Sequence, residues 1–284
     1  VGLTILSIGT SLPEIFTHIN ASLKELSGMA ASNIAIGTNI GSNIVQITLI
    51  IGILGLITKI KSSKSIQRRD GLVMLGSIVL LFLLGLDGVI SQLDGALLFF
   101  LYLGYLLHLY TREEELSEII AHKSKWTKKE FKNFTSHIVM ILVGLGILQF
   151  AANTIVDITL NFSNTLGIEQ SFFGLLIIGF ATALPEFTTA VMGLLRKSES
   201  LSLGVLIGSN ITNPMMALGI GAMITDNPIS KGLINFDIPF WFIVSAGLLL
   251  LFQRNKKLTK FGAALMIGSY IAYALYKTYS VGII

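Results

Sequence analysis

The sequence predicts an all-α membrane protein that crosses the bilayer many times. Of its 284 residues, 52% are hydrophobic and 13% are charged, whereas soluble domains are about 25% charged. The mean hydropathy is +0.76, and apolar runs of about 20 residues, the length that spans a bilayer, recur along the chain. Two of these runs carry the same polar motif, which indicates an internal repeat. Cysteine is absent, which excludes disulfides and thiolate metal sites.

Nine apolar runs are expected to be transmembrane helices. A polar segment, 111–134, is predicted to be a cytoplasmic loop between a first transmembrane half, 1–110, and a second half, 135–284. The chain opens inside an apolar run without a starting methionine, so we expect residues before Val1. The nine runs lie at about 1–23, 29–57, 72–86, 93–110, 136–158, 172–195, 201–224, 238–252 and 261–276.

The basic residues predict the orientation of the chain. If all nine runs cross the membrane, 17 of the 20 Lys and Arg residues fall on one side, and only Lys24, Lys231 and Lys277 fall on the other. Loops rich in Lys and Arg stay in the cytoplasm. We therefore expect an integral protein of a prokaryotic plasma (inner) membrane, with cytoplasmic basic loops and an external C-terminus.

Two motifs occur in the same order in both halves. Leu12-Pro13-Glu14 returns as Leu184-Pro185-Glu186, and Gly41-Ser42-Asn43-Ile44 returns as Gly208-Ser209-Asn210-Ile211. The first repeat covers about 1–57 and the second about 172–224. Because five crossings separate the two, the copies should point in opposite directions through the membrane. Inverted repeats with broken helices are typical of secondary transporters, which bind their substrate near the midplane where the repeats meet.

The repeated residues suit a cation. Each proline interrupts its helix, and the freed carbonyls persist at membrane depth only if they are buried or face a wet cavity. An acid at the bilayer centre costs about 2.5–3.5 kcal/mol or more, so Glu14 and Glu186 need compensation. One divalent cation would balance both, and two or more protons or monovalent cations could replace it. Hydroxyl oxygens that Na⁺ and Ca²⁺ accept lie nearby, on Thr10, Ser11, Thr182, Ser42 and Ser209.

The helix that follows each glutamate carries small and polar residues. Gly37, Gly41, Gly204 and Gly208 are interpreted as packing surfaces, because small residues let membrane helices approach closely. Ser42 with Gln46, and Ser209 with Asn213, share a helix face at i, i+4 spacing, so we expect both pairs to line one site. His18, one turn after Glu14, is expected to make a structural hydrogen bond rather than tune that carboxylate.

These motifs resemble the two repeats of the sodium/calcium exchanger family, within the cation/calcium exchanger superfamily and of prokaryotic type. The resemblance rests on residues 9–14 with 41–44 and on residues 182–186 with 208–211. It implies ten helices, five in each half, with the first one missing before Val1. It also implies a secondary active antiporter, not an enzyme, that exchanges Na⁺ for Ca²⁺ by alternating access. Its partners would be these ions and the lipid bilayer, with no cofactor, no nucleic acid and a monomeric state.

The resemblance further implies a cluster of cation sites centred on Glu14 and Glu186. Side-chain oxygens would come from Thr10, Ser11, Thr182, Ser42 and Ser209, backbone carbonyls from Ser7 and Gly179, and the remaining ligands from Gln46 and Asn213.

Three positions depart from the family pattern. Gln46 stands where Asn is common, Ala183 stands where the first repeat has Ser11, and Asn213 stands where many members have Asp. The neutral amide of Asn213 predicts that K⁺ is not required. With only two carboxylates the site also resembles that of calcium/proton exchangers, so a Ca²⁺/H⁺ antiporter remains the alternative. A cation channel is less favoured because of the inverted repeat.

Overall fold

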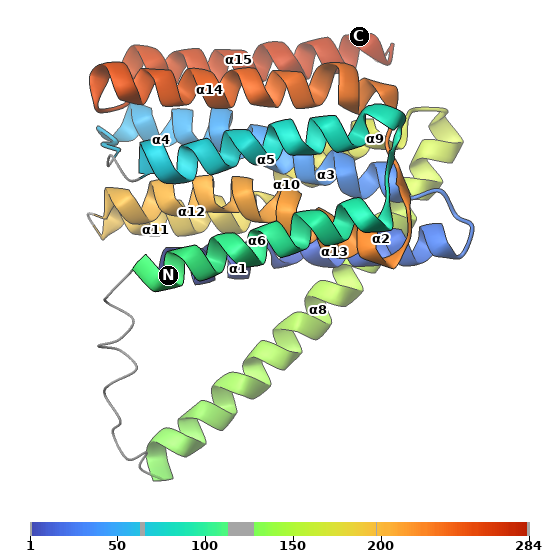
Figure 1. Ribbon diagram of the computed structural model, residues 1–284, viewed down its shortest axis with the longest axis horizontal. Coiled ribbons are helices and arrows are strands. Elements are labelled where there is room, and N and C mark those ends of the chain that lie inside the picture. Colours follow the sequence, from blue (N-terminus) through green and yellow to red (C-terminus); the bar gives the residue numbers. More distant parts are fainter. Residues whose placement is uncertain (1, 63–65, 113–127, 197, 283–284) are drawn as a thin grey trace.

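The computed structural model describes residues 2–62, 66–112, 128–196 and 198–282. Most helices run along one common direction and gather their ends at two opposite ends of a bundle, while α8 lies at an angle to the rest (Figure 1). The all-α architecture predicted from the sequence is confirmed.

The first half begins with two helices separated by a single residue and continues with three longer helical segments. Its elements are α1 (Gly2–Thr10), α2 (Leu12–Leu26), α3 (Ser32–Val45), the π-helical turn η1 (Gln46–Ile50), α4 (Ile51–Ile57), the π-helical turn η2 (Ile66–Asp70), α5 (Gly71–Leu84), the 3-10 turn η3 (Gly85–Asp87) and α6 (Gln92–Arg112).

The second half repeats this order after one additional helix. Its elements are α8 (Lys128–Leu166), α9 (Gln170–Phe173), the π-helical turn η4 (Gly174–Ile178), α10 (Gly179–Thr182), α11 (Leu184–Leu195), α12 (Glu199–Thr212), the π-helical turn η5 (Asn213–Ala217), α13 (Leu218–Ile224), the π-helical turn η6 (Leu233–Asp237), α14 (Ile238–Asn255) and α15 (Lys260–Ser280).

Six helical segments within the described residues are long and apolar enough to cross a membrane on their own. They are Ser32–Ile57, Gln67–Asp87, Gln92–Thr111, Gln170–Leu195, Leu201–Ile224 and Leu233–Asn255. The predicted spans that correspond to α1–α2, α8 and α15 form helices, and their crossing of the membrane stays a prediction.

Two details add to the sequence-based expectation. Part of the predicted loop 111–134 is helical, because α6 continues to Arg112 and α8 begins at Lys128; residues 113–127 lie outside the described ranges. A short antiparallel strand pair also forms, in which β1 (Val89–Ile90) pairs with β2 (Asn227–Pro228). Two-residue strands leave no alternating pattern in a sequence, so this pairing between the halves was not predicted.

The glycines of α3 allow its backbone to touch the second half. A Cβ atom on Gly41 would lie 2.1 Å from the backbone oxygen of Leu175, and one on Gly37 would lie 2.8 Å from that of Ser171. Gly174 meets α3 from the other side, where its Cβ would lie 2.5 Å from the Ile34 oxygen. The packing interpretation of Gly37 and Gly41 is therefore confirmed.

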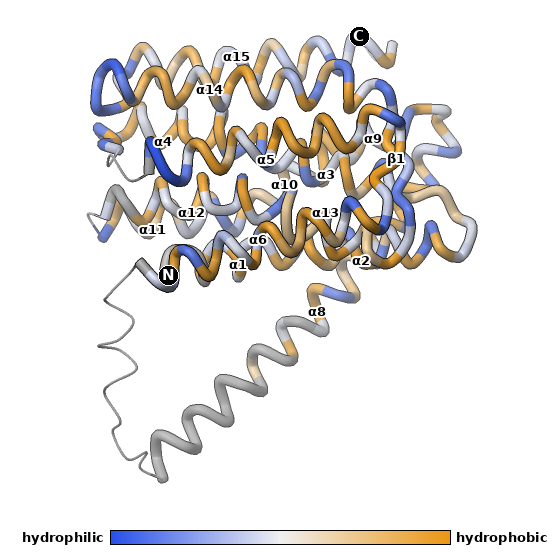
Figure 2. Tube along the Cα trace, in the orientation of Figure 1, coloured by the Kyte–Doolittle hydropathy of each residue, from blue (hydrophilic) through white to orange (hydrophobic). Residues whose placement is uncertain are grey.

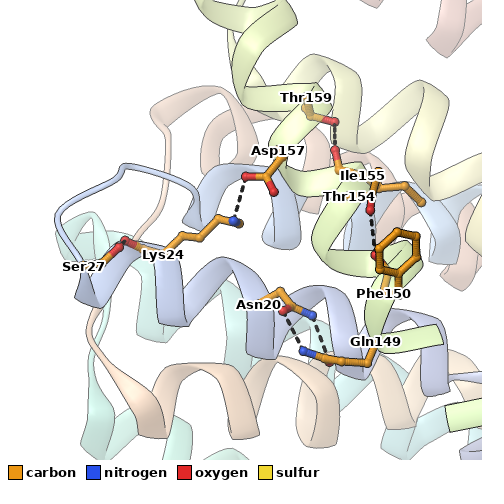
Figure 3. A network of polar contacts seen from close by, with 9 residues as sticks. All are labelled: Asn20, Lys24, Ser27, Gln149, Phe150, Thr154, Ile155, Asp157 and Thr159. Carbon is orange, nitrogen blue, oxygen red and sulfur yellow. Dashed lines mark hydrogen bonds and ion pairs between the residues drawn. The ribbon is translucent and has the colours of Figure 1, made fainter. Parts of the chain in front are cut away.

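Helix α8 contacts the glutamate-bearing first half through polar side chains of α2 (Figure 3). Asn20 and Gln149 exchange two amide hydrogen bonds of 2.9 and 3.1 Å. One turn further along α2, the Lys24 ammonium lies 2.7 Å from the Asp157 carboxylate. These contacts join the segment that follows Glu14 to the second half of the chain.

An aspartate ends a π-helical turn at the same place in each half. Asp70 ends η2 and accepts a hydrogen bond from Tyr105 of α6 at 3.0 Å. Asp237 ends η6 and accepts one from Tyr273 of α15 at 2.8 Å. Lys277 donates to the second oxygen of Asp237 at 3.0 Å. The two halves thus share local structure well beyond the two motifs found in the sequence.

Candidate ion-binding site

The first break lies immediately before Glu14. Helix α1 ends at Thr10 and α2 begins at Leu12, with Ser11 between them. The Ser11 N–H still donates to the Ser7 oxygen at 3.0 Å. Pro13, in the first turn of α2, has no N–H to donate, so the helix is interrupted where the sequence predicted a break.

The second break has the same form. Helix α10 ends at Thr182 and α11 begins at Leu184, with Ala183 between them. The Ala183 N–H donates to the Gly179 oxygen at 3.2 Å, and Pro185 lies in the first turn of α11. Each break therefore places a glutamate in the first turn of a new helix, where the helix dipole favours negative charge.

Both glutamates are buried and partly without hydrogen-bond partners. Glu14 and Glu186 are each 0% exposed. Ser42 donates to one oxygen of Glu14 at 2.6 Å, and Ser209 donates to one oxygen of Glu186 at 3.2 Å. The second oxygen of each carboxylate, Oε2, is buried with no hydrogen-bond partner among the described residues. A buried carboxylate oxygen without a partner is costly, so each Oε2 is open to a cation or a proton.

The threonines connect the two halves crosswise. The hydroxyl of Thr10 donates to the Ser7 carbonyl at 3.2 Å, and that of Thr182 lies 3.4 Å from the Gly179 carbonyl. Helix α1, which ends at Thr10, packs against α12, and α10, which ends at Thr182, packs against α3. Each break therefore lies against the helix that carries the motif serine of the other half.

Two further predicted ligands have oxygens without partners. The Ser11 hydroxyl and the Asn213 side-chain oxygen are both buried and make no hydrogen bond within the described ranges. The side-chain nitrogen of Asn213 donates to Asn43 at 2.9 Å, which fixes the orientation of the amide. Ala183 is 0% exposed at the position equivalent to Ser11, so the second half lacks this hydroxyl.

Both polar atoms of the Gln46 side chain are hydrogen-bonded to neighbouring side chains. Its nitrogen donates to the Ser42 hydroxyl at 3.0 Å, and its oxygen accepts from Asn210 at 2.9 Å. Gln46 therefore supports the serine that bonds Glu14. Direct binding of an ion by Gln46 stays a prediction.

A layer of amides behind the site was missed in the sequence. Asn39 donates to the backbone oxygen of Asn213 at 2.6 Å and lies 3.1 Å from the ring nitrogen Nε2 of His18. Trp241 donates to the Asn210 oxygen at 2.9 Å. His18 makes the structural contact that we expected. The recurrence of an asparagine after each motif serine was the signal that could have revealed part of this layer.

The candidate site holds two carboxylates and several neutral oxygens. Within the described residues, no three His, Asp or Glu side chains gather to hold a metal. Two carboxylates with otherwise neutral oxygens form a donor set of the kind that hard ions such as Na⁺ and Ca²⁺ accept.

Comparisons with known proteins agree with this chemistry. The family model for sodium/calcium exchanger proteins matches residues 1–111 and 136–279. The inner membrane protein YrbG of Escherichia coli is 29% identical over 279 residues, covering 96% of this chain and 84% of YrbG. The sodium/calcium exchanger MaX1 of Methanosarcina acetivorans is 26% identical over 308 residues, covering 96% of this chain and 87% of MaX1.

Solved structures of a sodium-calcium exchanger also match this chain. The sodium-calcium exchanger NCX_Mj, in a structure soaked with Na⁺ and Sr²⁺, superposes with a TM-score of 0.69 at 28% sequence identity. The match covers 96% of this chain and 85% of NCX_Mj. With buried paired glutamates, a family match over most of the sequence and a shared structure, the chain belongs to the sodium/calcium exchanger family of membrane transporters.

Proposed function

We propose that this protein exchanges Na⁺ for Ca²⁺ across the membrane, without a requirement for K⁺, by exposing one buried site alternately to the two sides. The observation that carries the proposal is the pair of fully buried glutamates. Each keeps one oxygen on a serine and leaves the other without a partner. The family match supports transport of these ions.

The charge of the site supports exchange rather than one-way binding. Two buried carboxylates would be compensated by one Ca²⁺ or by two Na⁺, and either form is far less costly to move than the empty, charged site. Release of one ion species on one side therefore favours binding of the other species before the site crosses. This coupling defines an antiporter.

The proposed ligands surround this pair. Glu14 and Glu186 supply the charge, and the unpartnered oxygens of Ser11 and Asn213 are available to an ion without loss of a hydrogen bond. The neutral amide of Asn213 supports independence from K⁺. The other proposed ligands are Thr10, Thr182, Ser42, Ser209 and Gln46, with the carbonyls of Ser7 and Gly179.

Alternating access would require the two breaks to move relative to the remaining helices. We propose that α1–α2 and α9–α11 slide together with their neighbours, and that the halves, 1–110 and 135–284, are inverted repeats. The segment 111–134 and the other basic loops would face the cytoplasm, and the C-terminus the exterior. The protein would act as a monomer in the inner membrane.

Coupling to H⁺ is the alternative, and the same two unpartnered carboxylate oxygens favour it. Each of these oxygens can accept one proton, which would remove the charge as effectively as a cation. The site then runs as a Ca²⁺/H⁺ antiporter with the same glutamates.

Calcium uptake into proteoliposomes separates these functions. We expect uptake when an outward Na⁺ gradient is imposed, and none with a proton gradient alone or with no gradient. Uptake driven only by protons would refute Na⁺ coupling. Calcium flow that needs no counter-ion would show a channel.

The two glutamates provide the test of the site. Glu14→Gln and Glu186→Gln should each abolish exchange, because each removes one of the two charges that hold Ca²⁺. Glu169→Gln makes the same chemical change at an exposed position and should leave exchange intact. Normal transport by either buried variant would refute the proposed site.

A further inference from the structure

A cavity of about 390 Å³ lies between two segments that are far apart in the sequence. One wall is the end of α4 with the residues after it, 55–59, and the other is the start of α15 with the residues before it, 257–260. Backbone pairing holds the walls together, because Lys61 and Lys257 form an antiparallel bridge and the Leu258 N–H donates to the Ile60 oxygen at 2.9 Å. Backbone hydrogen bonding therefore fixes the two walls of the cavity relative to each other.

The lining of this cavity is strongly basic. Lys59, Lys257 and Lys260 are exposed and come from both walls, and no acidic residue belongs to the lining. The surrounding sequence is also without acids, since none occurs between Glu25 and Asp70 or after Asp237. Three ammonium groups around one cavity with no anion among them favour an anionic ligand.

One part of the wall is apolar and exposed. Leu56 is 43% exposed and Ile57 is 73% exposed, and both lie next to Lys59 at the end of α4. A small soluble anion would gain nothing from these side chains. A ligand with a charged head and a hydrocarbon tail would contact the lysines and the apolar side chains at once.

The start of α15 adds to the positive field. Its 21 residues begin at Lys260, and the Thr259 hydroxyl caps the first turn by accepting from the Gly262 N–H at 3.1 Å. The positive end of the helix dipole therefore points toward the cavity. The hydrophilic segment that follows α4 and the α14–α15 turn lie at the same end of the bundle (Figure 2).

We propose that this cavity binds the phosphate headgroup of an anionic phospholipid, with an acyl chain along Leu56 and Ile57. Basic pockets between transmembrane helices at the cytoplasmic face are suited to such headgroups. The lipid would join the end of α4 to the start of α15, apart from the ion site. The proposal does not depend on which ion drives exchange.

Lipid binding to the purified full-length chain in detergent tests the proposal. Native mass spectrometry and the thermal unfolding midpoint would be followed while phosphatidylglycerol, phosphatidylcholine or inorganic phosphate is added. We expect phosphatidylglycerol to bind and to raise the midpoint, and the other two to have little effect at equal concentration.

Matched charge changes locate the site. The double variant Lys257→Gln/Lys260→Gln should bind phosphatidylglycerol about tenfold more weakly or worse, because each lysine near an anionic lipid contributes on the order of a fivefold gain in affinity. The double variant Arg196→Gln/Arg254→Gln removes the same charge from exposed positions outside the cavity and should bind within about twofold of the parent. Equal weakening in both would show diffuse attraction and overturn the site.

The remaining outcomes also decide the question. Stabilisation by inorganic phosphate equal to that by phosphatidylglycerol would show an anion site without a lipid. Equal binding of phosphatidylcholine would show that the lysines do not select the headgroup. Either result would overturn the proposal.

Discussion

A methyl group added at Gly41 is expected to separate the two halves of the protein beside the ion site. In Gly41→Ala the new Cβ would lie 2.1 Å from the backbone oxygen of Leu175 and 2.6 Å from its Cα. Ordinary contact begins at 3.4 Å, so the backbones of α3 and η4 must move apart by more than an ångström. Rotation of a side chain cannot relieve a clash with a backbone.

The expected cost follows from this displacement. Overpacking in a close-packed interior costs about 1–3 kcal/mol and occasionally more, against a gain of at most about 1 kcal/mol from replacing a helical glycine by alanine. We therefore expect a net loss of up to about 2 kcal/mol. Ser42 follows Gly41 directly and bonds Glu14 at 2.6 Å, so calcium transport should fall together with stability.

Gly76→Ala provides the control for this experiment. Gly76 lies within α5, and a Cβ there would meet no atom within 4 Å. This variant should unfold at the parent temperature or slightly higher and transport normally, whereas Gly41→Ala should unfold several degrees lower. Equal thermal midpoints and equal calcium uptake for the two variants would show that the close contact does not hold α3 in place.

Three further predictions follow from the hydrogen bonds. Ser42→Ala should raise the calcium concentration needed for half-maximal uptake about tenfold or more, because a hydrogen bond to a charged group contributes about 1.5–3 kcal/mol. Ser209→Ala removes a longer hydrogen bond and should have the smaller effect. A larger effect of Ser209→Ala than of Ser42→Ala would contradict this reasoning. Ser11→Ala removes a buried hydroxyl without a partner, so it should weaken ion activation in an uptake assay without lowering the thermal midpoint, whereas a lower midpoint with unchanged activation would indicate a structural role. Lys277→Met should destabilise the fold by about 3–5 kcal/mol, because it leaves the Asp237 carboxylate buried without its ion-pair partner. Adding Asp237→Asn to this variant should restore part of the thermal midpoint. No recovery would show that loss of the ion pair does not cause the destabilisation.

Much of the fold follows from features that act locally. Apolar runs of bilayer length predicted where the long helices lie, and a proline before each glutamate predicted both breaks. Repetition of the same motifs predicted that Ser42 and Ser209 accompany Glu14 and Glu186. These features can be recognised in a single sequence because each depends on residues only a few positions apart.

The rest depends on contacts between distant residues. Asn39 donates to the backbone oxygen of Asn213, 174 positions away. Every residue has a backbone oxygen, so the sequence does not indicate which one accepts this hydrogen bond. The side chain of Gln46 bonds Ser42 and Asn210, a choice set by packing at the meeting of the two halves. The sequence left the helical start of α8 open, because residues 128–133 are polar and polarity alone favours a loop as much as a solvated helix.

In the proposed exchange, the two buried carboxylates would also determine how the transport cycle responds to membrane voltage. No Lys or Arg occurs in residues 1–23, 29–57, 172–195 or 201–224, so the glutamates are the formal charges of the site. Loaded with one Ca²⁺ or two Na⁺, the proposed site would be neutral, and its crossing would be electrically silent. A third Na⁺ would give that crossing a net charge, and moving one elementary charge costs about 2.3 kcal/mol per 100 mV. The voltage dependence of exchange therefore reports the number of sodium ions bound to this pair of carboxylates.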